Sequence, residues 1–191
     1  MDEAVTDTRA PWRDTYLEMA RVLAEMRADC TRRKVGAIIF EPSTGYQVSS
    51  GYNGAPRGMP GCLSDGACPR GQHYEVKGVI VASTHRPEEI GKKRGMGDCI
   101  CGQRWPCGES VAPSSSYDTG PGSCIAIHAE ANALLRAGPK ARGMIMVVTE
   151  KPCDGCLKLC RGAALDCVLW PAEKGFDWER FPAPPMKSVF D

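Results

Sequence analysis

The chain has 191 residues, and 24 Lys and Arg residues against 23 Asp and Glu residues leave a formal net charge of +1 with the histidines neutral. This length fits one compact α/β domain, and a hydrophobic fraction of 42% can build a core, which excludes wholesale disorder. The near-zero charge argues against a dedicated nucleic-acid binder, because such proteins usually carry a strong basic excess.

The first residues of the chain and its cysteine content bear on the cellular compartment. The first 14 residues mix acidic residues with Arg9 and Arg13 and contain no apolar signal-peptide region, and no segment approaches the roughly 18 consecutive apolar residues of a membrane span. We therefore expect a cytoplasmic protein with reduced thiols. The 11 Cys beside 3 His then favour metal binding or catalysis over disulfides, and their odd number argues against complete pairing.

The segment from residue 11 to residue 53 predicts a helix followed by a β-hairpin. Apolar residues at helical spacing predict the helix over residues 11–28: Trp12, Tyr16, Met19, Ala20 and Leu23. Residues 35–40 are a short apolar run that is typical of a buried strand. Turn residues at 42–45 then predict that residues 46–52 return as the second strand.

Residues 54–123 are a long insertion rich in Gly, Pro and Cys. In this insertion, only residues 76–83 and 87–93 indicate regular structure, as a strand and a short helix. A structureless loop of this length is uncommon in a compact domain, so we expect a bound metal to hold it.

Regular patterning resumes at Cys124. A helix ending near residue 138 is predicted by the apolar residues Ile125, Ala129, Leu134 and Leu135. Residues 144–149 and 167–170 predict two further buried strands, with a short helix over 153–162 between them. This alternation predicts parallel pairing in part of the sheet, beside the antiparallel hairpin, and the tail from Pro171 is expected to pack on the body.

The strongest chemical signal combines His128 with Cys153 and Cys156. Two Cys separated by two residues at a helix start can place both sulfurs on one side of a metal ion, and His128 can complete a three-ligand site. Zinc with three protein ligands keeps a fourth position for water, which is the catalytic arrangement. The alternative for the two cysteines is a thioredoxin-like redox pair.

Glu130 lies two residues beyond His128 and can sit beside the metal without binding it. A carboxylate there can take a proton from the water molecule and deliver it to a leaving nitrogen. Taken alone, Glu130 would be a solvated helix residue. The combined pattern His-x-Glu followed by Pro-Cys-x-x-Cys, however, is the established signature of zinc nucleobase deaminases.

The chain resembles the deoxycytidylate (dCMP) deaminase family of the cytidine deaminase-like superfamily. The motifs that carry the resemblance are Cys30 with residues 35–39, Gly-Tyr-Asn-Gly at 51–54 with Pro56 and Gly58, residues 128–133 and residues 149–156. It implies a three-layer α/β/α sandwich around a mixed, about five-stranded sheet, as one domain over residues 1–191 with the insertion at 54–123. It also implies hydrolysis of dCMP, or a 5-substituted dCMP, to dUMP or its analogue and ammonia, feeding dTMP synthesis.

The resemblance implies roles for individual positions. The zinc ligands would be His128, Cys153 and Cys156, with Glu130 as the proton shuttle and water as the nucleophile. Asn53 would hold the sugar and Ala129 would contact the substrate. Arg33 and Lys34 resemble the region that grips the 5′-phosphate, which suits basic side chains; the alternative is a solvated charge run.

The insertion departs from the family pattern in its number of potential metal ligands. Cys30 and Cys62 resemble positions used for a structural zinc in the family. We expect at least one structural zinc, with candidate ligands Cys62, Cys68, Cys99, Cys101 and Cys107, and His73, Cys30 and Cys124 as further potential ligands. The alternative is that these cysteines are small buried residues, as we expect for Cys160 and Cys167.

The resemblance also implies partners. The family binds dCTP as activator and dTTP as inhibitor at the loop of residues 51–58, and it is often hexameric, so we expect such effectors and a homo-oligomer, without membrane or stable nucleic-acid binding. Two other functions stay open: deamination of a base in RNA or single-stranded DNA, and a catalytically inactive, zinc-stabilised binding module. Asn53 in its loop favours the nucleotide substrate, and an intact Glu130 argues against the inactive module.

Overall fold

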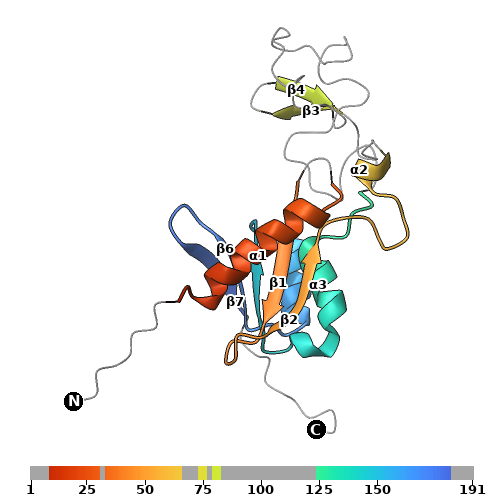
Figure 1. The fold of residues 1–191 in the computed structure, drawn as a ribbon. Helices are drawn as coiled ribbons and strands as arrows, with labels where there is room; N and C mark the ends of the chain where they lie inside the picture. Colours follow the sequence, from red (N-terminus) through yellow and green to blue (C-terminus); the bar gives the residue numbers. More distant parts are fainter. Residues whose placement is uncertain (1–8, 31–32, 66–72, 77–78, 83–123, 182–191) are drawn as a thin grey trace, which may run out of the picture. The chain divides into compact units, whose positions relative to one another are not determined.

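The computed structural model describes residues 9–30, 33–65, 73–76, 79–82 and 124–181 (Figure 1). The chain divides into two compact units. The first, which we call the sheet unit, consists of Met1–Ala28, Val35–Tyr52 and His128–Asp191. The second, the insert unit, consists of Asp29–Lys34 and Asn53–Ile127.

Within its described residues, the sheet unit holds a five-stranded mixed sheet in the order β2-β1-β5-β6-β7. The strands are β1 (Gly36–Phe40), β2 (Gln47–Tyr52), β5 (Ile145–Val148), β6 (Cys167–Pro171) and β7 (Phe176–Arg180). β1 pairs antiparallel with β2 and with β5, β5 pairs parallel with β6, and β6 pairs antiparallel with β7. The predicted hairpin, the parallel pair and the mixed five-stranded sheet are therefore confirmed. The tail contains a strand that the sequence pattern does not predict, β7, which follows a turn at Gly175.

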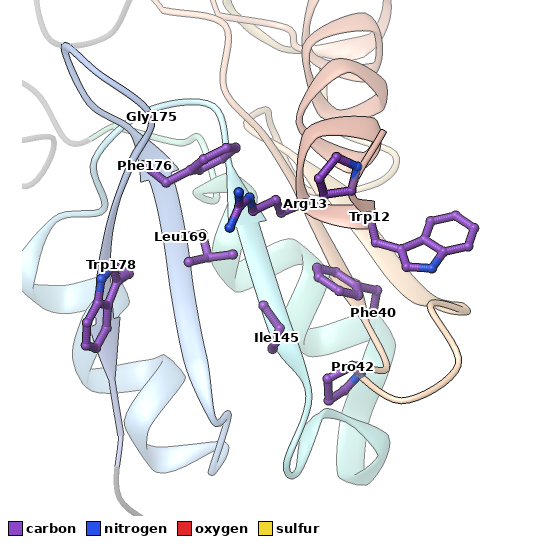
Figure 2. A pocket seen from close by; sticks show the side chains of 10 residues that line it. Trp12, Arg13, Phe40, Pro42, Ile145, Leu169, Gly175, Phe176 and Trp178 are labelled. Carbon is purple, nitrogen blue, oxygen red and sulfur yellow. The ribbon is translucent and has the colours of Figure 1, made fainter. Parts of the chain in front are cut away.

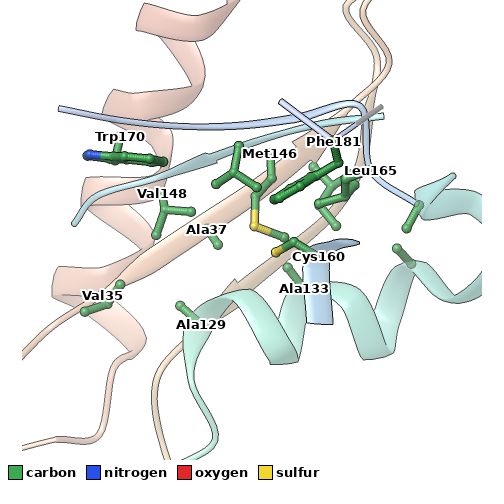
Figure 3. Close-up of a cluster of buried hydrophobic side chains, with 14 residues drawn as sticks. Val35, Ala37, Ala129, Ala133, Met146, Val148, Cys160, Leu165, Trp170 and Phe181 are labelled. Atoms are coloured by element: carbon green, nitrogen blue, oxygen red, sulfur yellow. The ribbon is translucent and has the colours of Figure 1, made fainter. Parts of the chain in front are cut away.

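Helices cover both faces of this sheet and complete a three-layer α/β/α arrangement, as expected (Figure 1). They are α1 (Trp12–Arg27), α3 (Ala129–Ala137), which a short 3₁₀ turn η2 (Gly138–Ala141) follows, and α4 (Asp154–Gly162). α1 packs against one face, where Ile38, Phe40 and Val147 are buried. α3 and α4 enclose the larger core on the opposite face, which contains Met146 and Val148 (Figure 3).

The buried face of α1 differs in part from the predicted one. Tyr16 and Ala20 are buried as expected, but Trp12 and Met19 are exposed, and their places on the packing face are taken by Leu17 and Ala24. The physical reason is that α1 carries apolar residues on two sides, so periodicity alone does not identify the side that meets the sheet.

The helices approach the sheet through glycine. A Cβ atom at Gly51 would lie 2.1 Å from the carbonyl oxygen of Ala129 and 2.4 Å from the amide nitrogen of Ala133, and one at Gly36 would lie 2.1 Å from the carbonyl oxygen of Ala20. Real Cβ atoms do not approach so closely, so main-chain atoms set the separation between these helices and the sheet.

The prediction for α3 was wrong in its start and only partly right in its packing face, where Ala129 and Leu134 meet the core as expected but Leu135 does not. The helix begins at Ala129 because Ile127 forms a β-bridge with Gly54, which excludes a helical conformation there. Alanines at Ala129, Ala133 and Ala137 form the packing face, whereas Leu135 is 72% exposed. A helix that touches β2 with its main chain has no room for leucine on that side.

Helix α4 ends in a Schellman motif with an unfavourable residue. The amide of Leu165 donates to the carbonyl oxygen of Cys160 at 3.2 Å, and the amide of Ala164 donates to that of Arg161 at 3.0 Å. Ala164 has φ 56°, the left-handed conformation that this motif normally gives to glycine.

We therefore expect Ala164→Gly to stabilise the protein by about 1 kcal/mol, because glycine relieves the left-handed strain at a smaller cost in unfolded-state entropy. Thermal unfolding should show a Tm about 2–4 °C above wild type. Ala163→Gly is the matched control, since Ala163 has φ −76° and gains nothing from glycine. A lower Tm for Ala164→Gly would contradict this interpretation.

The described part of the insert unit contains α2 (Cys62–Asp65) and the antiparallel pair β3 (His73–Val76) and β4 (Val79–Ala82). The strand predicted over residues 76–83 is confirmed in part as β4, but the prediction missed β3, which ends at Val76. The helix predicted over residues 87–93 lies outside the described residues. No helix in the described ranges combines the length and the apolar character that crossing a membrane requires.

Candidate metal centre and active site

Two helix starts in the sheet unit carry the predicted metal ligands. His128 is the N-cap residue of α3, and Cys153 is the N-cap residue of α4, both with extended backbone. The sulfur of Cys153 accepts a hydrogen bond from the amide of Cys156 at 3.5 Å. Free amide groups and the helix dipole favour thiolates at such a position.

The three side chains converge on one point. Nδ1 of His128 lies 3.2 Å from Sγ of Cys156 and 3.6 Å from Sγ of Cys153, and the three potential ligand atoms all lie within 4.8 Å of one another. In a tetrahedral zinc site, bonds of about 2.3 Å to sulfur and about 2.05 Å to nitrogen place a sulfur ligand and a nitrogen ligand about 3.6 Å apart. The donor set therefore fits zinc in both chemistry and spacing.

The strand before Cys153 is held at its end by reciprocal hydrogen bonds. The amide of Thr149 donates to the carbonyl oxygen of Gly36 at 3.0 Å, and the hydroxyl of Thr149 accepts from the amide of Gly36 at 3.1 Å. Pro152 is buried directly before the first cysteine. These contacts fix the loop that delivers Cys153 to the cluster.

Glu130 is a buried acid in the first turn of α3, with 4% of its surface exposed. Burial raises the pKa of Glu130, and its hydrogen bond to its own backbone amide and the charge of His128 partly oppose this effect. Burial, and then the neighbouring Glu130 and Cys153, raise the pKa of the Cys156 thiol. A bound dication would offset this effect, because its positive charge stabilises the thiolate of Cys156 beside the carboxylate of Glu130. The arrangement of sulfur and carboxylate is therefore suited to a metal.

The predicted substrate-binding residues Arg33, Lys34 and Asn53 lie in the insert unit. The side-chain amide of Asn53 donates to the carbonyl oxygen of Arg33 at 2.9 Å, so the structure brings the two predicted substrate-binding segments together. Asn53 is buried, whereas Arg33 and Lys34 are exposed. Ala129 belongs to the sheet unit, and its side chain is fully buried in the core.

The other cysteines differ in how far the structure describes them. Cys62 and Cys30 are buried in the insert unit, and Cys124 is half-buried, while Cys68, Cys99, Cys101 and Cys107 lie outside the described residues. Burial raises the pKa of Cys160 to about 12 and that of Cys167 to about 11, which agrees with thiols that serve packing.

Asn132 makes a polar contact that was not predicted from the sequence. Its side-chain amide donates to the carbonyl oxygen of Tyr52 at 2.8 Å. The signals in the sequence were its place in the motif at residues 128–133 and its polar side chain between two alanines. Its partner is far away in the chain, so local pattern could not identify it.

A separate groove of about 470 Å³ opens on the α1 face of the sheet (Figure 2). Aromatic and aliphatic side chains line it, including Trp12, Phe40, Ile145, Leu169, Phe176 and Trp178. The guanidinium of Arg13 lies 5.7 Å from the centre of the Phe176 ring. Because α3 and α4 pack on the opposite face, this groove is distinct from the metal cluster.

The sequence model of the cytidine and deoxycytidylate deaminase zinc-binding region matches residues 10–170. The chain belongs to this deaminase family. The resemblance predicted from the motifs is thereby confirmed, and the His128, Cys153 and Cys156 cluster agrees with the zinc-binding character of the family.

Individual members of the deaminase family and one solved structure are similar to the chain. The deoxycytidylate deaminase of Mycobacterium phage D29 is 30% identical over 167 residues, which cover 87% of this chain and 98% of the relative. That of Schizosaccharomyces pombe is 29% identical over 150 residues, and the match covers 78% of this chain and 33% of the relative. The crystal structure of dCMP deaminase from cyanophage S-TIM5 in complex with dCMP and dUMP has a TM-score of 0.49 at 20% identity, covering 86% of this chain and 83% of that chain.

Proposed function

We propose that this protein is a zinc-dependent hydrolytic deaminase that converts dCMP, or a 5-substituted dCMP, to dUMP, or its analogue, and ammonia. The observation that carries this proposal is the convergence of His128, Cys153 and Cys156 beside the buried Glu130, in a chain that the deaminase family model matches over residues 10–170. The phage D29 relative, which is matched over 98% of its length, is named a deoxycytidylate deaminase and supports the substrate.

In this mechanism His128 would hold zinc through Nδ1, and Cys153 and Cys156 would hold it through their sulfurs. Zinc, when bound, supplies Lewis-acid activation of a water molecule for attack on C4 of the cytosine ring. A carboxylate oxygen of Glu130 would accept a proton from the attacking water and deliver it to the leaving amino nitrogen. Burial raises the pKa of Glu130, which favours the protonated state that this delivery requires.

We assign recognition of the 5′-phosphate to Arg33 and Lys34, and the sugar contact to Asn53. Both basic side chains are exposed, and Asn53 holds the carbonyl of Arg33 through its side-chain amide. Guanidinium and ammonium groups bind phosphate through charge-assisted hydrogen bonds, so a substrate with a 5′-phosphate gains affinity that a free nucleoside lacks.

The substrate assignment predicts a strong preference for the nucleotide. We expect kcat/KM for deoxycytidine to be about 100-fold or more below that for dCMP, because the charge-assisted contacts to phosphate are lost. Arg33→Ala should raise KM for dCMP and leave the rate with deoxycytidine unchanged, whereas Lys174→Ala, which removes an exposed charge from the turn before β7, should affect neither. Ammonia release measures the activity of wild type, Arg33→Ala and Lys174→Ala. Turnover of deoxycytidine by wild type at the same kcat/KM as dCMP would contradict the nucleotide assignment.

Finer features of the deaminase are proposals of the same kind. We propose one deaminase-type domain over residues 1–191 with an insertion at 54–123, and at least one structural zinc held by cysteines of the insertion, among which Cys62 is buried. We also propose a cytoplasmic homo-oligomer, a hexamer by family resemblance, with dCTP and dTTP as effectors. Exposed apolar residues on α1 support an interface: Met19, Val22 and Met26.

A further inference from the structure

In the described part of the sheet unit, three side-chain hydrogen bonds connect α3 to β2. The hydroxyl of Ser49 donates to the carbonyl oxygen of Ala133, the guanidinium of Arg136 donates to that of Ser50, and the side-chain amide of Asn132 donates to that of Tyr52, each at 2.8 Å. Together with the close approach at Gly51, these bonds fix α3 along β2.

Of these three bonds, the one from Asn132 reaches the end of the strand. Tyr52 is the last residue of β2, and its pairing with Gly36 is the last of the β1–β2 ladder. The backbone amide of Asn132 donates to the carbonyl oxygen of His128 at 2.9 Å, so Asn132 lies one helical turn beyond His128. Asn132 therefore connects the helix that begins at His128 to the point where the chain leaves the sheet.

The peptide group that follows Tyr52 is planar, so a hydrogen bond to the Tyr52 carbonyl oxygen also fixes the direction of the Asn53 amide. We infer that Asn132 is a positioning residue for substrate binding, which acts by fixing the Tyr52–Asn53 peptide group relative to α3. The inference rests on the proposed function, in which Asn53 holds the sugar of the nucleotide. Ser49, three residues earlier in β2, contributes a bond of the same length without this effect on Asn53.

Asn132→Asp is the decisive variant, because aspartate has nearly the same shape but no amide to donate to the Tyr52 carbonyl. We expect KM for dCMP to rise about tenfold, with kcat within about threefold of wild type, since the change affects binding of the sugar more than the proton transfer. Ser49→Ala is the matched control and should lower Tm without changing KM. Asn132→Ala removes the same donor without a charge and replaces Asn132→Asp if that variant does not fold.

Hydrogen–deuterium exchange of the peptide covering residues 50–55, without substrate, provides a second measurement. Exchange should increase in Asn132→Asp and stay at the wild-type level in Ser49→Ala. Equal KM values and equal exchange in the two variants would overturn the inference, because Asn132 would then be a structural connection only. If wild-type protein releases no ammonia from dCMP while the exchange difference is present, the proposed function fails and the positioning of the Tyr52 peptide stands.

Discussion

Glu130→Gln is expected to lower kcat for dCMP deamination by about 100- to 10,000-fold, the usual contribution of a positioned acid–base group. Glutamine keeps the shape of glutamate, but its amide cannot accept and return a proton at neutral pH. Tm should not fall, because burying a neutral amide costs less than burying a carboxylate. Ammonia release, zinc analysis and thermal unfolding on the same preparation measure the three effects.

Glu173→Gln is a suitable control for this experiment, since Glu173 is an exposed acid in the turn between β6 and β7. It should have wild-type activity and zinc content. Unchanged ammonia release in Glu130→Gln would contradict the role of Glu130 as proton shuttle. If wild-type protein also lacked deaminase activity on nucleotides while binding zinc, the zinc-stabilised binding module would be favoured instead.

Cys156→Ala is expected to remove about one zinc ion per chain and to abolish deamination, because Cys156 supplies one of three converging ligand atoms and is the most buried of the three. Metal analysis after dialysis against a weak chelator measures the loss. Any zinc that stays bound reports ions outside this cluster, so the same measurement counts the proposed structural zinc of the insertion.

Cys160→Ala is the matched control, because it removes a buried thiol from the same helix one turn later. Cys160 packs in the core beside Leu165 and Val168, so this variant should lose stability through a small cavity but keep zinc and activity. Equal zinc content in Cys156→Ala and wild type would exclude the cluster as the metal site.

The strands that are buried on both faces were predictable from their own apolar sequence, whereas β2, which is only partly buried, was predictable from the turn residues before it. All five residues of β1 are buried, so the strand is visible as a continuous apolar run, as is β5. β7 alternates poorly, with Asp177 and Trp178 exposed at the edge of the sheet, and its sequence therefore lacks the pattern of a strand. An edge strand is determined by its neighbour β6 more than by its own composition.

The metal cluster was predictable for a different reason. Cys153 and Cys156 belong to one helix start, so their spacing alone places both sulfurs on the same side, and His128 opens the other helix that meets this point. The contact of Asn132 with Tyr52 joins residues 80 positions apart, and it depends on how closely α3 lies on β2. The distance between α3 and β2 depends on glycine and alanine, and residues this small contribute little to the hydrophobic pattern of the sequence.

The glycine at position 51 also has a consequence for how the protein tolerates mutation. Because α3 rests on β2 through main-chain atoms, the height of this helix above the sheet does not depend on the volume of any side chain between them. Ile38 and Val147 are large buried side chains on the α1 face, so a change in their volume acts on the packing of α1 and not on the contact between α3 and Gly51. On the α1 face, Gly36 makes the same kind of close contact with the carbonyl oxygen of Ala20, so both helix layers keep their distance from the sheet through positions that have no room for a side chain.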